Sequence, residues 1–283
     1  MLPASPAAAL AAIPPPPGSA LDLGPLTLRY YGVAVALAVL AAIVLTRWRF
    51  AQRGGDPETV DAVALWAVLA GLVGARLAWV STNLDQVVER PIALIAIWEG
   101  GLAFFGGLLL GGLAVVWQLR RRRASIPAFA DAVAPAIPLG QAIGRWGNYF
   151  NEELYGTATD LPWALELSTG ELVHPTFLYE MLGNLAIMAV LMVVGLRGLL
   201  RPGGLLLAYG IGYGLLRFSL EFIRTDGNIF IFGISGNTYT AAGLFLASIA
   251  ALVWWQRREP AASGAPADGR TGASGGRGRS RRR

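Results

Sequence analysis

Residues 174–196 read HPTFLYEMLGNLAIMAVLMVVGL, and from Met181 onward this stretch contains no charged side chain. It is long enough to cross a bilayer as a helix, which requires about 20 mostly apolar residues. The composition of the whole chain agrees, because 54% of its 283 residues are hydrophobic and only 14% are charged. Ordinary soluble domains contain about 25% charged residues, and disordered chains have low hydrophobicity. The sequence therefore excludes both classes and predicts a helical membrane protein.

Other stretches of similar length and composition flank this one. A shorter apolar stretch, Ile92 to Trp98, is too short to cross and ends at Gly100-Gly101, which predicts a half-helix or interfacial helix. The predicted fold is thus an all-α polytopic membrane protein with seven transmembrane helices and this short element. The seven predicted spans are Leu28–Thr46, Val60–Ser81, Gly101–Leu119, Pro127–Trp146, His174–Leu196, Gly204–Ile223 and Thr238–Gln256.

Arginine placement predicts the orientation of the spans. Cytoplasmic loops of membrane proteins carry an excess of basic residues, and here the arginines follow spans one, three, five and seven. We therefore expect the N-terminus outside and the C-terminus in the cytoplasm. The predicted domains are an irregular outer-face segment (1–25), a seven-span membrane domain (26–257) and a disordered Arg-rich cytoplasmic tail (258–283). The arginines used are Arg47, Arg49, Arg53, Arg120–Arg123, Arg197, Arg201, Arg257 and Arg258.

Missing residue types limit the chemistry. The chain has no cysteine, its 23 basic residues are all arginine, and His174 is its one histidine. These facts exclude disulfides, thiolate metal sites, a cysteine nucleophile and a lysine Schiff base, and they leave little for a multi-histidine metal site. The net charge of +5 is modest, and the arginines follow the span ends, so no nucleic-acid partner is predicted.

Ionisable residues within spans are expensive in lipid, so each is a functional hypothesis. Spans one, five and seven are nearly free of them. In the fourth and sixth spans, polar residues recur every three or four positions and so share one helix face. The residues on these two faces are Asp131, Pro135, Pro138, Gln141, Arg145 and Asn148, and then Tyr209, Tyr213, Arg217, Glu221 and Arg224.

Two of these arginines suggest an anion site. Arg145 and Arg217 both fall near the outer ends of their spans, and a guanidinium presents a planar fork matched to phosphate oxygens. A lipid phosphate is therefore a fitting ligand. The alternative for Arg217 is a purely structural ion pair with Glu221, four residues on. A lone histidine at the start of a span, such as His174, is more often a helix cap or a hydrogen-bond partner than a base.

Several ordered motifs resemble one known family. Residues 144–156, GRWGNYFNEELYG, look like the signature G-R-x-G-N-F-x-N-x-E-x-x-G of the prolipoprotein diacylglyceryl transferase family, with Tyr149 where phenylalanine is usual. The resemblance extends from about Leu23 to Trp254. Its other parts are residues 29–32 (RYYG), 98–107 (WEGGLAFFGG), 174–180 (HPTFLYE) and 213–218 (YGLLRF) with Glu221 and Arg224.

The resemblance implies a function. Such an enzyme lies in the bacterial cytoplasmic (inner) membrane with its active site toward the outer face. It transfers the diacylglyceryl group of phosphatidylglycerol to the lipobox cysteine of a preprolipoprotein, forming a thioether and releasing glycerol 1-phosphate. Besides these two substrates it meets membrane lipids, and no metal or soluble cofactor is implied. The implied catalytic residues are Arg145, Arg217, Glu153 and Glu221, and the implied substrate-binding residues are Tyr31, Asn148, Asn151, Gly156, Tyr213, Arg224 and His174.

One departure concerns thiol activation. Phe105 stands where many family members have histidine, and phenylalanine cannot accept a proton. We expect the positive field of the two arginines to favour the thiolate, with Glu153, Glu221 or His174 as the proton acceptor. A membrane transporter or a lipid-binding scaffold that uses outer-face Arg and Glu residues is the alternative function. The sequence leaves open whether Leu161 to Val173 forms a head domain or a loop.

Overall fold

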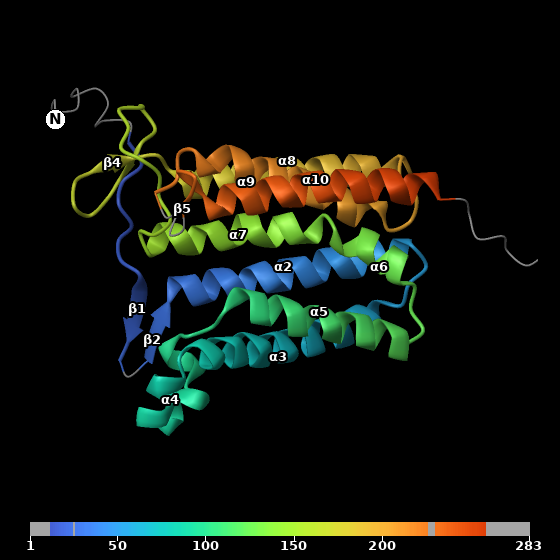
Figure 1. Cartoon of the computed structure of the whole chain (residues 1–283), viewed down its shortest axis with the longest axis horizontal. Helices are drawn as coiled ribbons and strands as arrows, with labels where there is room; N and C mark the ends of the chain where they lie inside the picture. The colour runs from blue at the N-terminus through green and yellow to red at the C-terminus, as the bar shows by residue number, and fades with distance from the viewer. Residues whose placement is uncertain (1–11, 25, 226–229, 259–283) are drawn as a thin grey trace, which may run out of the picture.

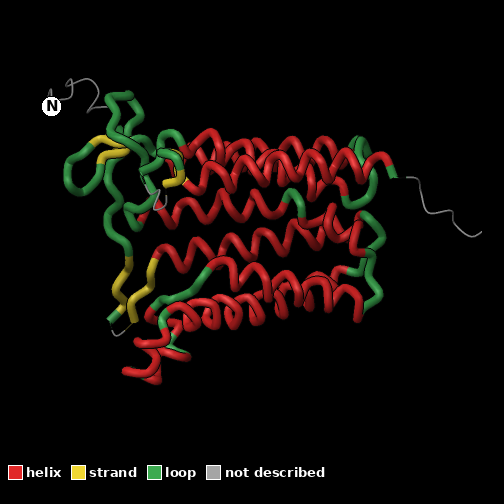
Figure 2. Tube along the Cα trace, viewed as in Figure 1, coloured by secondary structure: helices red, strands yellow, loops and turns green. Residues whose placement is uncertain are grey.

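The computed structural model describes residues 12–24, 26–225 and 230–258. Long helices run side by side along one axis (Figures 1 and 2), and each predicted span coincides with a helix or a pair of helices. The predicted tail beyond Arg258 and the first eleven residues of the predicted outer segment lie outside the described residues. The long helices are α2 (Tyr30–Gln52), α3 (Pro57–Thr82), α5 (Phe104–Arg121), α6 (Ile126–Val133), α7 (Ala136–Phe150), α8 (Thr176–Leu196), α9 (Gly204–Glu221) and α10 (Gly236–Arg257).

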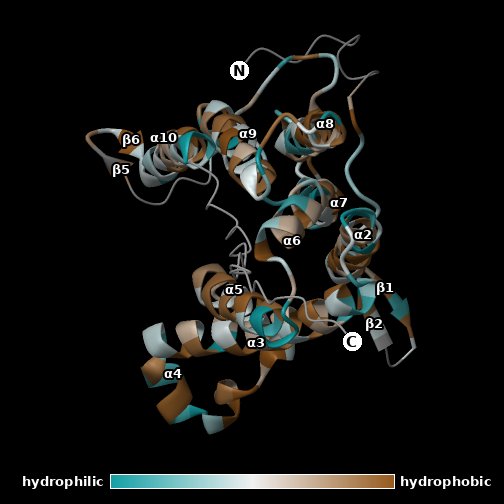
Figure 3. Cartoon of the chain, turned by 90° about the vertical axis from the view of Figure 1, so that its right-hand side faces the viewer, coloured by the Kyte–Doolittle hydropathy of each residue, from teal (hydrophilic) through white to brown (hydrophobic). Residues whose placement is uncertain are grey.

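The chain is a polytopic membrane protein. Within the described residues, α2, α3, the α6–α7 pair, α8 and α10 are long and apolar enough to cross a membrane. Their outward faces carry large exposed hydrophobic side chains, such as Leu40 at 58% and Val44 at 65% exposure, which only lipid accommodates in such number. Figure 3, a ribbon coloured by hydropathy, shows that hydrophobic residues recur along these helices. The helices α5 and α9 are shorter and richer in glycine and polar residues, so the count of seven spans stays a prediction.

The fourth span is broken in two by proline. Helix α6 ends at Val133 and α7 begins at Ala136. Pro135 has no N–H to donate to the carbonyl of Asp131 four residues earlier, and the Arg49 guanidinium donates to that carbonyl oxygen instead, over 3.5 Å. The Asp131 carboxylate in turn accepts the backbone N–H of Leu205 at 3.0 Å. Asp131 therefore caps the first turn of α9 rather than marking a polar path through the membrane.

Arg49 shows where the sequence prediction of the first span was too short. We expected Arg49 in the cytoplasmic loop after that span, but α2 continues to Gln52 and Arg49 is only 1% exposed. Its guanidinium lies among Asp131 and Met192, where it contacts the Met192 sulfur at 2.8 Å. The Asp131 carbonyl, which the proline break leaves without a backbone donor, is the partner of this arginine inside the bundle.

Small hairpins cover the end of the bundle opposite α6 (Figure 1). They are β1–β2 (Ala20–Leu23, Leu26–Arg29), β3–β4 (Leu165–Glu166, Leu172–Val173) and β5–β6 (Phe230–Ile231, Ile234–Ser235). Of the outer-face segment that we expected to be irregular, Ala20–Leu23 form strand β1, whereas residues 14–19 form no helix or strand. Ile13 pairs with the β3 region, since its N–H donates to Ala164 O at 2.8 Å and its carbonyl accepts from Glu166 N at 2.9 Å.

The stretch Leu161 to Val173 is thus a small head and not a plain loop. Its hairpin buries an apolar cluster of Leu165, Leu167 and Val173 against Phe177 in the first turn of α8. The head fixes the chain segment between α7 and α8, and this segment includes the last part of the signature, residues 151–156.

The predicted short element before α5 is a set of short helices. Helix α4 (Leu84–Glu89) precedes the predicted stretch Ile92 to Trp98, which itself forms two 3₁₀ turns, η1 (Pro91–Leu94) and η2 (Ile97–Glu99). The buried Arg76 of α3 holds them, because its guanidinium donates to the carbonyls of Ala93, Leu94, Gly100 and Gly101 and stacks on Trp79 with 4.4 Å to the ring centroid. One arginine therefore satisfies carbonyls that these short helices leave free.

Glycines bring α3 and α5 into backbone contact. A Cβ added at Gly74 would lie 2.3 Å from the Gly106 carbonyl oxygen, and one at Gly106 would lie 2.3 Å from the Gly74 carbonyl oxygen. Such small residues let membrane helices approach closely. The pair lies on one side of the bundle, and α8, α9 and α10 lie on the other (Figures 1 and 3).

This packing predicts opposite effects of one substitution at two glycines. Gly74→Ala should lower the free energy of unfolding by about 1–3 kcal/mol, because the new methyl meets backbone on α5 that cannot move alone. Gly112→Ala is the matched control, since nothing lies within 4 Å of its Cβ position and alanine favours the helix by about 1 kcal/mol. Thermal unfolding in detergent measures both, and equal melting temperatures would contradict the proposed contact.

Candidate functional site

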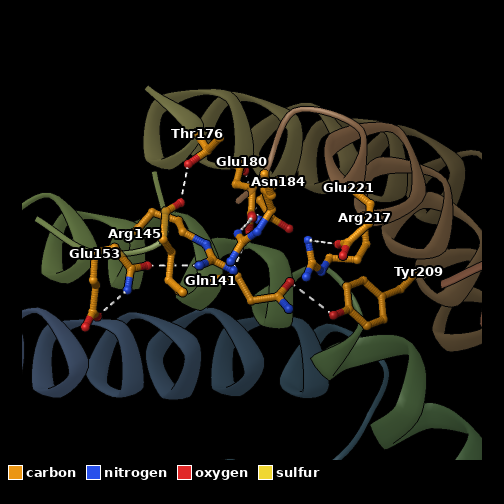
Figure 4. A network of polar contacts seen from close by, with 12 residues as sticks. Gln141, Arg145, Glu153, Thr176, Glu180, Asn184, Tyr209, Arg217 and Glu221 are labelled. Carbon is orange, nitrogen blue, oxygen red and sulfur yellow. Dashed lines mark hydrogen bonds and ion pairs between the residues drawn. The ribbon is translucent and has the colours of Figure 1, made fainter. Parts of the chain in front are cut away.

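A buried polar network joins α7, α8 and α9 in the half of the bundle nearest the hairpins. Figure 4 shows its side chains pointing toward one another from the three helices. On α7, Gln141, Arg145 and Asn148 recur at helical spacing, so they share the face that meets α8 and α9, as the sequence pattern predicted.

Arg145 is held from two directions. Its Nη1 donates to Asn148 Oδ1 at 2.9 Å, and Asn148 Nδ2 donates to Glu153 Oε1 at 2.7 Å. Its Nη2 forms an ion pair with Glu180 of α8. The Arg145 side chain keeps 19% exposure, and its contacts with Asn148 and Glu180 fix the guanidinium in place.

Glu180 is the centre of the network, and sequence reasoning missed it. Its carboxylate is 1% exposed and pairs with both Arg145 and Arg224, which follows the end of α9. The fifth span was therefore wrongly described as nearly free of ionisable residues. The signal was present, because Glu180 ends the motif HPTFLYE and Asn184 follows one turn later on the same face.

Helix α9 supplies a second ion pair. Arg217 Nη1 lies 2.8 Å from Glu221 Oε2, and Ser235 donates to the other Glu221 oxygen at 2.6 Å. One and two turns earlier, Tyr213 stacks on Tyr209, whose hydroxyl donates to Gln141 Oε1 at 3.0 Å. The predicted i,i+4 pair is thus present, and it lies beside the Tyr209–Gln141 hydrogen bond that joins α9 to α7.

The charges of the network balance. Arg145, Arg217 and Arg224 face Glu153, Glu180 and Glu221, so that three positive and three negative groups share the region. A buried charge is tolerated only when it is paired and hydrogen-bonded. An anion that binds here must therefore compete with the carboxylates for the arginine donors. The ion pairs already orient the guanidiniums. Among the described residues no cluster of His, Asp and Glu fit to hold a metal ion occurs.

The end of the signature is a tight crossing of three segments. The Gly156 N–H donates to His174 O at 3.0 Å, and the Thr157 N–H donates to Ile223 O at 2.8 Å. A Cβ at Gly156 would lie 2.7 Å from His174 Cβ and 2.8 Å from Ile223 O. Only glycine fits there, and the crossing brings Arg224 to Glu180. His174 itself contacts the Tyr179 hydroxyl through Nδ1 at 3.3 Å.

Two predicted site residues lie beside the network and not in it. The Tyr31 ring of α2 packs against Gly147, where an added Cβ would lie 2.6 Å from the ring. Asn151 caps the end of α7 with its backbone and is exposed. Phe105 is the second residue of α5, is 76% exposed and contacts Phe104 edge-on. Tyr31 thus reaches the network through its packing on α7.

Comparison with known proteins places this site in a family. The family model for prolipoprotein diacylglyceryl transferase matches residues 18–254, which includes every residue of the network. The chain belongs to the prolipoprotein diacylglyceryl transferase family. The family resemblance carried by residues 144–156 is thereby confirmed.

Similar curated proteins bear the full name phosphatidylglycerol–prolipoprotein diacylglyceryl transferase. The protein from Corynebacterium efficiens is 44% identical over 262 residues, which covers 85% of this chain and 81% of that protein. The second such protein of Streptomyces coelicolor is 42% identical over 280 residues, covering 93% and 88%. The protein of Mycobacteroides abscessus is 41% identical over 266 residues, covering 85% and 78%. The match to this family therefore spans the whole membrane domain.

The position of Glu180 predicts a large loss of stability on its removal. Glu180→Ala leaves Arg145 without a carboxylate on α8 and takes the same partner from Arg224, and breaking a buried pair costs about 3–5 kcal/mol. The control Glu58→Ala removes an exposed carboxylate in the first turn of α3 and should stay within about 0.5 kcal/mol. Thermal unfolding in detergent compares them, and similar values for the two variants would show that Glu180 does not hold the helices.

Proposed function

We propose that this protein transfers the diacylglyceryl group of phosphatidylglycerol to the lipobox cysteine thiol of a preprolipoprotein. The products are a thioether and glycerol 1-phosphate. The observation that carries the proposal is the polar region in which Arg145 of α7 and Arg217 of α9 lie near each other, in a chain of this family. Family membership favours this reaction over a transporter or a lipid-binding scaffold, and Asp131, the one acid that suggested a path to the inner face, serves as a helix cap.

The two arginines handle the phosphate in this proposal. The reaction breaks the bond between the glyceryl carbon and the phosphate oxygen, so negative charge develops on the leaving phosphate. Oriented guanidinium donors in a water-poor site stabilise that charge without reorganising. Glu180 and Glu221 hold the two arginines in the absence of lipid, and they keep each cation in place for the incoming phosphate.

The thiol proton passes to Glu153 in this proposal. Both Glu221 oxygens are engaged, by Arg217 and Ser235, and the Nδ1 atom of His174 contacts Tyr179. Glu153 accepts one hydrogen bond, from Asn148 through Oε1. The thiol gives its proton to Glu153, the sulfur forms the bond to the glyceryl carbon, and the phosphate leaves with the electron pair of the broken C–O bond. The proton then leaves Glu153 for the phosphate or for water.

Membrane placement follows the same reasoning. We place seven spans across the bacterial inner membrane, with α5 and α9 completing the set, the N-terminus outside and the C-terminus in the cytoplasm. Arginines gather near the α6 end, and the hairpins cover the other end of the bundle, which supports this orientation. The network then opens toward the outer face, where a preprolipoprotein presents its lipobox.

The reaction itself is the first test. The purified protein is mixed with phosphatidylglycerol and a lipobox peptide, and the thioether is measured by mass spectrometry. Arg145→Ala and Arg217→Ala should each lower kcat by roughly a hundredfold or more, because each removes oriented donors from the leaving phosphate. Arg47→Ala is the matched control, since this arginine pairs with Asp61 at the other end of the bundle and is 43% exposed. Near-normal rates in either site variant would remove that arginine from its role.

The role of Glu153 as proton acceptor is tested with a peptide substrate whose nucleophile is already deprotonated. Glu153→Gln keeps an amide oxygen for Asn148 but cannot take a proton, so kcat with a cysteine peptide should fall by about 10²–10⁴-fold. A selenocysteine peptide is ionised at neutral pH, so it should restore most of the rate in Glu153→Gln. Arg217→Ala is the control, because its defect concerns the leaving phosphate and selenium should not repair it. Failure of the selenol to rescue Glu153→Gln would exclude Glu153 as the base.

A further inference from the structure

Asn184 carries a buried oxygen without a partner. It lies on α8 one turn after Glu180 and is 0% exposed. Its Nδ2 donates to the Glu180 backbone carbonyl at 2.9 Å, whereas its Oδ1 has no hydrogen-bond partner among the described residues. A buried acceptor left unpaired costs about 1–3 kcal/mol, so it calls for an explanation such as a ligand.

The position of this oxygen is between the two arginines of the proposed phosphate site. Glu180, one turn away on the same face, holds Arg145. The neighbouring Gly183 lies against Leu216, where an added Cβ would be 2.5 Å from Leu216 Cδ1, and the next residue on α9 is Arg217. Figure 4 shows Asn184 between these groups. A phosphate held by both arginines therefore brings its substituents close to Asn184.

Because Asn184 Oδ1 is a hydrogen-bond acceptor, its ligand must carry a donor. The guanidinium donors nearby are engaged by carboxylates, and a phosphodiester has acceptors but no donor to offer an amide oxygen. The glycerol headgroup of the lipid, on the other side of the phosphate from the diacylglyceryl group, has hydroxyl donors. We propose that Asn184 Oδ1 accepts a hydrogen bond from a hydroxyl of this headgroup and selects lipids with a polyol headgroup. This inference rests on the proposed function.

A second unpaired amide in the chain provides a control. Gln118 Oε1 on α5 is also buried without a partner, and Gln118 is 5% exposed. It lies near the other end of the bundle, next to Leu119 of the apolar cluster formed with Phe50 and Phe129. Gln118 thus resembles Asn184 in having a buried side-chain amide with an unpaired oxygen, but it lies elsewhere in the bundle.

The test compares two lipids that differ in the headgroup hydroxyls. Phosphatidylglycerol and phosphatidylpropanol with identical acyl chains share the phosphate and a three-carbon headgroup, and the latter lacks hydroxyls. The ratio of their kcat/KM values is measured with a lipobox peptide. We expect the wild-type protein to prefer phosphatidylglycerol and Asn184→Leu to lose about tenfold of that preference. Gln118→Leu should keep the wild-type ratio.

The outcomes separate this inference from the proposed function. A ratio that is equal in Asn184→Leu and in the wild-type protein overturns the role of Asn184 while product formation upholds the transferase. If Asn184→Leu does not fold, the wild-type protein alone decides, because equal kcat/KM values for the two lipids also overturn the role. Absence of thioether from phosphatidylglycerol in the wild-type protein overturns the proposed function and this inference with it.

Discussion

One buried carboxylate organises the polar half of this membrane protein. Glu180 binds an arginine from α7 and another that follows α9, and it does so where water is excluded. In such a low-dielectric region neither arginine is tolerated without a partner. The three helices therefore meet in one arrangement, in which Glu180 fixes Arg145 and, through Arg224, the end of α9. The rest of the site, from Asn148 and Glu153 to the Gly156 crossing, is arranged around this contact.

The same constraint shapes the rest of the bundle, where every polar backbone group must find a partner inside the protein. Arg49 replaces the N–H that Pro135 cannot provide, and Arg76 satisfies the carbonyls of the short helices before α5. Where no polar group intervenes, as between Gly74 and Gly106, the helices approach until their backbones touch. Arg49 and Arg76 donate to backbone carbonyls, and Arg145 and Arg217 are the proposed phosphate ligands. One residue type suits both tasks because a guanidinium has several donors.

Much of this was predictable from the chain because its signals are local. Long apolar stretches fixed the helix positions, and the three-to-four spacing along residues 141–148 and 209–221 predicted the two polar faces that Figure 4 shows to meet. Pattern reasoning missed Glu180 because the long apolar stretch around it outweighs one acid and one asparagine, Asn184, on the same face. It also misjudged Arg49 and did not foresee the pairing of Ile13 with Ala164 and Glu166, because both environments come from segments distant in sequence.

The sequence by itself determined the class of protein, the approximate helices, the family and the polar helix faces on which Arg145 and Arg217 lie. It did so because hydrophobic length and helical spacing are properties of neighbouring residues. Only the tertiary structure decided which charges neutralise one another, which acid holds which arginine, and which oxygen stays unpaired. Those pairings join α7, α8 and the segment after α9. Their energies depend on burial and distance, and neither is written in the order of the residues.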